Sequence, residues 1–207
     1  MENEQEIFWK NKVNLNYMYQ NSEFDYSKAE EGWNIITRLV DMRNLISVLE
    51  LGCNIGRNLG VLRKLFPKIS LNAVELNAQA LDVADANYKL DSKFAGSILE
   101  FQTDEFFDLV FTSGVLIHIH PDNLLITMKK MFDFSRRYII MVEYFNRTPV
   151  TIDYRGEKNK LFKCDFGKLF IENFPVKLID VGFLWGHIYD NAGFDDVTFW
   201  VFEKNAE

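Results

Sequence analysis

The chain has 207 residues, a length that suits one domain with room for a small appendage. Its residues are 48% hydrophobic, enough for a sizeable core, and its formal charge of −7 argues against nucleic acid as the main partner. Neither Cys53 nor Cys164 lies in a CxxC pair or beside clustered histidines, so we expect no metal site. Two cysteines, no signal peptide and no run of 18 apolar residues predict a cytoplasmic protein without a membrane span.

The first 44 residues are polar with scattered aromatic side chains. We expect a helix over 7–19 and a clearer one over 26–44, in which Trp33 lies on the apolar face and packs on the core. Together they predict an N-terminal helical cover, 1–44, over the rest of the chain, 45–207. The other aromatic residues of this cover could pack on the core or line a pocket.

The most informative stretch of the sequence is 46–58, which reads ISVLELGCNIGRN. A β-branched, apolar run predicts a buried strand, and the apolar spacing that follows predicts an amphipathic helix. Between them, Gly52 and Gly56 lack a Cβ, so the chain can turn sharply and a ligand can approach the main chain. Backbone N–H groups at the start of a helix can face a polar or anionic ligand. A plain strand-to-helix turn is the alternative interpretation.

The rest of the chain alternates between predicted strands and helices. We expect strands over 70–75, 94–99, 107–114 and 138–144, and helices over 78–88 and 121–134. This alternation predicts a parallel, doubly wound α/β sheet. The segment 145–172 breaks it and is expected to be irregular and to serve the acceptor side of a site. Two last strands, 176–185 and 197–204, have no predicted helix between them, so we expect an antiparallel return at the sheet edge.

In an open α/β sheet, ligands bind at the carboxyl ends of the strands. Glu75 ends the second strand there, and its carboxylate could accept hydrogen bonds from both hydroxyls of a ribose. A nicotinamide-dependent oxidoreductase is a competing interpretation of the glycine turn. Its G-x-G-x-x-G fingerprint matches only at the first position, because Asn54 and Arg57 stand where the other glycines belong.

The segments ELGCNIGRN (50–58), AVELN (73–77) and FDLV (107–110) resemble class I S-adenosylmethionine-dependent methyltransferases. A narrower resemblance, to the methylases associated with pseudaminic acid biosynthesis, covers most of the chain. Its motifs are FW (8–9), FDLVFTSGVLIHIHP (107–121), EYFNRTPV (143–150), YRG (154–156), LFKCDF (161–166) and GFDDVTFWVFEK (193–204). The chain departs from that family at His120, where the family has Asn, and over 10–14, where the family has a glycine-containing stretch. These departures concern the acceptor.

The resemblance implies a Rossmann-like, seven-stranded, mostly parallel sheet with an antiparallel last strand and helices on both faces. It implies S-adenosylmethionine (SAM) as the cofactor, with 97–98 near the adenine. A buried Glu50 would need donors or a cation, and the sulfonium and amino groups of SAM would supply positive charge nearby. The residues expected at the cofactor are Glu50, Gly52, Asn54, Gly56, Asn58, Glu75, Leu76, Ser97, Ile98, Ser113, Gly114 and Val115.

Methyl transfer requires an aligned acceptor and, for an oxygen or nitrogen acceptor, a place for its proton. Three side chains are candidates for this chemistry, and each has a structural alternative. His118 could be a core or helix-capping histidine, Glu143 a structural acid paired with Arg137 or Arg155, and Arg155 a solvated loop cation rather than a clamp for an acceptor carboxylate. The residues expected to line the acceptor pocket are Phe8, Trp9, Tyr17, Tyr144 and Tyr154.

The sequence therefore predicts a SAM-dependent methyltransferase that acts on a small polar acceptor, with a pseudaminic acid-type sugar or a related intermediate as the candidate. A SAM-binding or partner-regulating module without turnover is the second hypothesis, and a nicotinamide-dependent oxidoreductase is the third. The sequence leaves the oligomeric state open.

Overall fold

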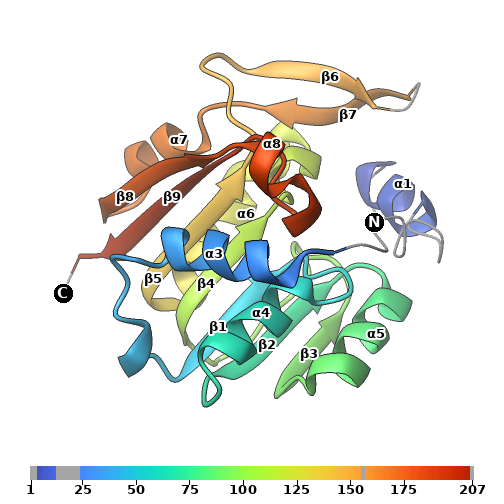
Figure 1. Ribbon diagram of the computed structural model, residues 1–207. Coiled ribbons are helices and arrows are strands. Elements are labelled where there is room, and N and C mark those ends of the chain that lie inside the picture. The colour runs from blue at the N-terminus through green and yellow to red at the C-terminus, as the bar shows by residue number, and fades with distance from the viewer. Residues whose placement is uncertain (1–3, 13–23, 155–156, 206–207) are drawn as a thin grey trace.

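The computed structural model describes residues 4–12, 24–154 and 157–205 (Figure 1). The strands are β1 (Ser47–Leu51), β2 (Ser70–Glu75), β3 (Ser92–Ala95), β4 (Phe107–Ser113), β5 (Ser135–Glu143), β6 (Val150–Tyr154), β7 (Glu157–Lys163), β8 (Val176–Leu184) and β9 (Val197–Lys204). The α-helices are α1 (Glu4–Lys12), α3 (Tyr26–Ile36), α4 (Arg57–Leu65), α5 (Ala78–Tyr88), α6 (Pro121–Phe134), α7 (Phe166–Asn173) and α8 (Gly186–Tyr189). Three short 3₁₀ helices are η1 (Met42–Asn44), η2 (Leu116–His118) and η3 (Asp190–Ala192).

Seven strands form one sheet in the order β3-β2-β1-β4-β5-β9-β8. The pairs from β3 to β5 are parallel, while β9 is antiparallel to both of its neighbours, β5 and β8. The predicted mostly parallel sheet with an antiparallel last strand is therefore confirmed. The strand order reverses between β1 and β4, which places a crevice at the carboxyl ends of these two strands.

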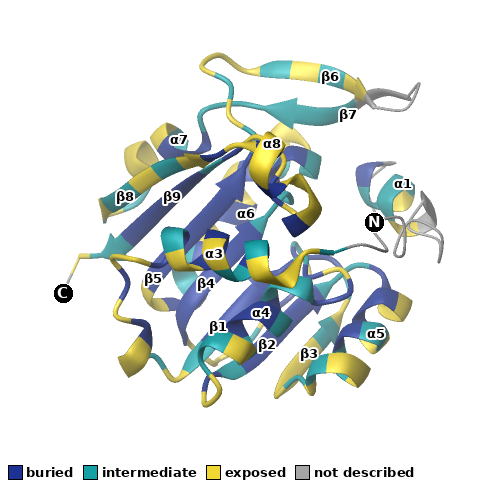
Figure 2. Ribbon diagram, viewed as in Figure 1, coloured by how far each residue is buried: buried dark blue, intermediate teal, exposed yellow. Residues whose placement is uncertain are grey.

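The central strands of the sheet are buried on both faces, as their apolar character predicts, while the edge strands β3 and β8 are partly exposed (Figure 2). Leu109 and Phe111 of β4 point into one core, which also holds side chains of α3, α4 and α5. Val110, between them, points into the other core, which holds side chains of α6 and α7. This alternation along one strand explains why helices pack on both sides.

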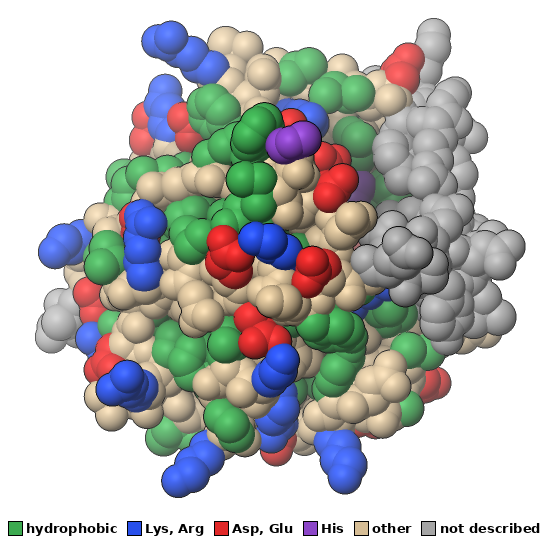
Figure 3. Space-filling view, in the orientation of Figure 1, with side chains coloured by type: hydrophobic (Ala, Val, Ile, Leu, Met, Phe, Trp, Pro, Cys, Tyr) green, Lys and Arg blue, Asp and Glu red, His purple; other side chains and the backbone are tan. Residues whose placement is uncertain are grey.

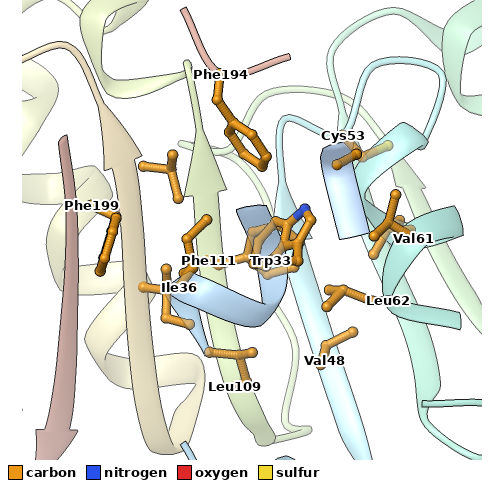
Figure 4. Packing of buried hydrophobic residues seen from close by; sticks show 14 of the residues in the cluster. Trp33, Ile36, Val48, Cys53, Val61, Leu62, Leu109, Phe111, Phe194 and Phe199 are labelled. Carbon is orange, nitrogen blue, oxygen red and sulfur yellow. The ribbon is translucent and has the colours of Figure 1, made fainter. Parts of the chain in front are cut away.

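Trp33 is the centre of the core on the α3 side (Figure 4). Its side chain is fully buried, and its ring meets Phe111 edge-on with the centroids 5.0 Å apart. Its indole N–H donates to Asn58 Oδ1 at 3.2 Å, which joins α3 to α4. The expected core role of Trp33 is thus confirmed, and α3 packs directly against the sheet.

Several expectations about secondary structure are wrong. The segment 145–172 is regular: β6 and β7 form an antiparallel hairpin, and α7 follows it. Two helical turns, α8 and η3, fit between β8 and β9, where we expected none. The first helix begins earlier than predicted, at Glu4, and α3 ends at Ile36 rather than continuing to 44. Among the described residues, no helix has both the length and the apolar character needed to cross a bilayer.

Trp33→Ala is expected to lower the free energy of unfolding by about 3–5 kcal/mol, because it removes a buried aromatic side chain and leaves a cavity between α3 and the sheet. Urea denaturation measures the change. Trp185→Ala is the matched control, since that side chain is 54% exposed at the start of α8, where Figure 3 shows exposed hydrophobic side chains. The control should change stability by no more than about 0.5 kcal/mol. Equal losses in both variants would contradict the central role of Trp33.

Candidate active site

The turn after β1 has an unusual backbone, in which Gly52, Asn54 and Gly56 have φ angles of +83°, +50° and +77°. We expected its N–H groups to face a ligand, and for four of them this is wrong. The N–H of Gly56 donates to the carbonyl oxygen of Cys53 at 2.9 Å. The N–H groups of Gly52 and Cys53 donate to the carbonyl oxygen of Val74, at 2.7 and 3.2 Å. The N–H of Asn54 donates to Glu75 Oε2 at 2.7 Å. The turn is therefore fastened to the end of β2.

Glu75 lies at the carboxyl end of β2, as predicted, and receives hydrogen bonds on both oxygens. Besides the bond from Asn54, Oε1 accepts from the N–H of Asn77 at 2.9 Å. Burial raises the pKa of the carboxyl above its ordinary value, while these backbone donors act in the opposite direction. Because each carboxylate oxygen can accept more than one hydrogen bond, Glu75 keeps the capacity to bind hydroxyl groups.

A cavity of about 320 Å³ follows the carboxyl ends of β1, β2 and β4 and the corner after β3. This volume is at the lower end of the range for small-molecule sites. Of the residues expected at the cofactor, those that line it are Gly52, Asn54, Glu75, Leu76, Ser97, Ile98, Ser113, Gly114 and Val115. Side chains from three separate strand ends therefore converge on one hollow.

Gly56 does not line this cavity. A Cβ at this position would lie 2.8 Å from the Cβ of Ala84 and 3.1 Å from the ring of Tyr88, both on α5. Its positive φ and the close approach of α5 explain the glycine. The packing therefore contradicts the expectation that Gly56 opens the main chain to a ligand.

Glu50 and Asn58 lie beneath the turn rather than in the cavity lining. Glu50 is 1% exposed, and its Oε1 accepts from Asn58 Nδ2 at 2.8 Å. Asn58 in turn accepts from the indole of Trp33, so a chain of hydrogen bonds runs from β1 through α4 to α3. Burial raises the pKa of Glu50 to about 8, and the charge of nearby Glu75 adds to the effect.

Glu143 ends β5 and is fully buried. Its Oε1 accepts from the N–H groups of Val115 and Leu116, at 3.0 and 3.1 Å. The suggested pairing with Arg137 is wrong, because Arg137 donates to Glu203 at 2.9 Å. Burial raises the pKa of Glu143 to about 7, against the effect of these donors. Glu143 thus holds the loop after β4, which lines the cavity, without lining the cavity itself.

His118 and Trp9 line the cavity together, at the end beside the loop after β4. Their ring centroids are 3.8 Å apart, with the planes tilted by 50°. Burial lowers the pKa of His118 to about 3, so the imidazole is uncharged at neutral pH. The helix α1 that carries Trp9 is fastened to the β6–β7 hairpin, because Gln5 Nε2 donates to the carbonyl oxygen of Lys160 at 2.8 Å. Figure 1 shows α1 beside the end of this hairpin.

The other predicted acceptor-side residues do not line the cavity or cannot be placed. Phe8 packs edge-on against Trp9 at 5.1 Å, outside the lining. Tyr144 packs against the core, with Lys163 Nζ 4.6 Å from its ring. Tyr17, Arg155 and the side chain of Tyr154 lie outside the described part of the chain.

Sequence reasoning missed some residues of the cavity, which are Gln5, Glu6, Leu99, Ile119 and Asn123, and it noted His120 as a departure from the family. Two signals could have found several of them. Gln5 and Glu6 precede Trp9 by one helical turn. The predicted helix N-terminus at Pro121 lies next to Ile119, His120 and Asn123. His120 is the N-cap of α6, with its Nδ1 accepting from the N–H of Asp122 at 3.3 Å.

Residues 48–137 match the family model of the methyltransferase domain. This part of the chain is therefore similar to methyltransferase domains. The matched range contains β1, the glycine turn, Glu75 and the loop after β4. A comparison with curated protein sequences gives no significant match.

Solved structures of several methyltransferases share the fold of this chain. One is magnesium protoporphyrin IX methyltransferase from Synechocystis, solved with S-adenosylhomocysteine (SAH). It is 10% identical in sequence, the alignment covers 98% of this chain and 100% of that one, and the TM-score is 0.72. The 1,6-didemethyltoxoflavin-N1-methyltransferase of Burkholderia thailandensis is 12% identical, with 100% and 92% covered and a TM-score of 0.72. N-methyltransferase NodS from Bradyrhizobium japonicum is 18% identical, with 88% and 99% covered and a TM-score of 0.66. At these identities the likeness concerns the fold.

The methyltransferase sheet differs from that of a dinucleotide dehydrogenase, because its last strand is antiparallel and inserted beside β5. The oxidoreductase interpretation is therefore not supported. Among the described residues, no group of three or more His, Cys, Asp or Glu side chains could hold a metal ion.

Glu50→Gln is expected to change how stability depends on pH. The folded state holds the proton of Glu50 more tightly than the unfolded chain, where the pKa is near 4.5, so this carboxyl lowers stability as the pH rises from about 4.5 to about 8. Gln cannot titrate and keeps an acceptor for Asn58. The variant should therefore gain on the wild type by up to roughly 1.4 kcal/mol per pH unit across this window.

Denaturant unfolding at a series of pH values between about 5 and 8 measures this gain. Glu105→Gln, at an exposed carboxyl, is the control and should follow the wild type. A constant difference between Glu50→Gln and the wild type over the whole range would contradict the raised pKa.

Proposed function

We propose that this protein transfers a methyl group from SAM to a small polar acceptor that reaches the cavity between α1 and the loop after β4. The observation that carries the proposal is the convergence of Glu75, the Gly52 turn and the corner at Ser97 on one cavity within a methyltransferase domain. When bound, SAM supplies a sulfonium methyl group that a nucleophilic oxygen or nitrogen can take by direct displacement.

The residues present fit an adenosyl ligand. Glu75 offers carboxylate oxygens for ribose hydroxyls at the tip of β2. Gly52 lines the cavity, although its missing Cβ makes room for Val115, whose Cγ2 would lie 2.6 Å from it. Among the described residues of the lining, none is Lys or Arg, while Glu6 and Glu75 are acidic. An acidic lining favours a cofactor that carries a sulfonium and an ammonium group.

The acceptor end of the cavity is assigned to Trp9 and His118. A buried imidazole with a lowered pKa is a weak base, so we assign His118 to orient the acceptor rather than to hold its proton. Glu143 faces the backbone of Val115 and Leu116, and we assign it as a positioning residue for this loop. These assignments leave the acceptor's own proton to solvent or to a group outside the described residues.

The acceptor class we propose is a pseudaminic acid-type sugar or a related intermediate. The support is the sequence resemblance of the segments 107–121 and 143–150, and the polar side chains of Gln5, His120 and Asn123 beside the cavity. A reducing compartment such as the cytoplasm agrees with both cysteines being free thiols.

Glu75→Ala is expected to weaken SAM and SAH binding about ten- to hundredfold, the range for a hydrogen bond to a charged group. Titration calorimetry with SAM, SAH and NAD measures it, and NAD should not bind the wild type. The unfolding midpoint of each variant reports whether the fold is intact, because Glu75 also fastens the turn after β1. Glu105→Ala is the control for removing an acidic side chain. Unchanged affinity in an intact Glu75→Ala variant would contradict the ribose role.

Trp9→Ala is expected to reduce turnover of the acceptor about tenfold and to weaken SAM binding much less, because the ring lies beside the loop after β4. The measurement is SAH formation with pseudaminic acid-type sugars and their activated forms, against Trp185→Ala as a control. Binding of SAM without SAH formation from any of these sugars would contradict the proposed acceptor class. A loss of SAM affinity in Trp9→Ala as large as its loss of turnover would contradict the proposed division of the cavity.

A further inference from the structure

The corner after β3 lies next to Glu75 in the sheet. Ala95 is the register partner of Glu75, and the N–H of Gly96 donates to the carbonyl oxygen of Glu75 at 2.9 Å. If Glu75 binds the ribose, as proposed above, the base attached to that ribose extends toward Ser97 and Ile98. The recognition of the base is therefore a question about the side chains gathered at this corner.

The hydroxyl of Ser97 both accepts and donates a hydrogen bond within the protein. Its oxygen accepts from the N–H of Leu99 at 3.0 Å, and its proton is donated to the carboxylate of Glu6. Ser97 is 5% exposed, so this arrangement is part of the buried wall of the cavity. The polar group that the Ser97 side chain places at this corner is therefore the carboxylate of Glu6, to which it is hydrogen-bonded.

Glu6 comes from α1, far from Ser97 in the sequence, and it also lines the cavity. The helix is held independently at its neighbouring residue, where Gln5 donates to the carbonyl oxygen of Lys160. One turn further along, Trp9 contacts His118 on the same side of the helix. The position of Glu6 thus depends on three separate attachments of α1.

We propose that Glu6 binds the exocyclic amino group of the adenine of SAM. A carboxylate only accepts hydrogen bonds, and the adenine 6-amino group is a donor, so the two are complementary. A carboxylate has about four acceptor positions, so it can accept from more than one donor at a time. This inference rests on the proposed function, and it adds a cofactor-binding residue that comes from the N-terminal cover.

The test compares binding of SAH with binding of its purine-riboside analogue, which lacks only the 6-amino group. The wild type is expected to bind SAH about ten- to hundredfold more tightly than the analogue. Glu6→Ala should reduce SAH affinity by a similar factor and bind the two ligands nearly equally. Alanine favours the helical state, so α1 should still form. Glu100→Ala, at an exposed acid close to Ser97 in the sequence, is the matched control and should discriminate as the wild type does.

The outcomes separate this inference from the function it rests on. Failure of the wild type to bind SAH would overturn both. Equal binding of SAH and the analogue by the wild type would leave the proposed function standing and overturn the assignment of Glu6; this comparison needs no variant. Discrimination that persists in Glu6→Ala would show that another group binds the amino group and would also overturn it.

Discussion

The hydrogen bonds of the Glu75 carboxylate are the interaction on which the site depends. They join the tip of β2 to the turn after β1 and to the start of the segment that leads into α5. With the bonds from Gly52 and Cys53 to Val74, they fix the turn in its left-handed backbone conformation. The turn that lines the cavity is therefore held in place by hydrogen bonds. Glu75, the side chain proposed to bind the cofactor, is one of the groups that hold it.

Glu50 and Glu143 repeat the same device at other strands. Each is a buried carboxylate on or at the end of a strand, and each accepts hydrogen bonds from a neighbouring segment: Asn58 for Glu50, and the loop after β4 for Glu143. Removing a carboxylate from water is costly, and the raised pKa values of both groups show that their donors offset only part of this cost. Burying these carboxylates lowers the stability of the fold, and their hydrogen bonds fix the positions of α4 and of the loop after β4.

The sequence alone predicts the elements whose signal is local. The helix at Pro121–Phe134 has proline in its first turn and a continuous apolar face, and its predicted bounds match the structure, as do those of β2, α5 and β9. The place of the cavity could be predicted from the glycine turn and Glu75, because both lie at strand ends. The partners of Glu143, the β6–β7 hairpin and the place of α1 could not be predicted, because they are contacts between segments distant in the chain. The contact of Gln5 with Lys160 has no local signature.

The position of α1 has a consequence for how the two ends of the cavity communicate. Glu6 and Trp9 are three residues apart, so they lie on one side of a single short helix. One reaches the corner after β3, and the other reaches the loop after β4. Because a helix moves as a unit, a ligand that fixes Glu6 also fixes Trp9, and therefore the wall that an acceptor would meet. A nine-residue helix is marginal in isolation, so α1 also relies on its other attachment, the hydrogen bond of Gln5 to Lys160. Under the roles proposed for Glu6 and Trp9, cofactor binding and formation of the acceptor pocket are then two effects of the same attachment.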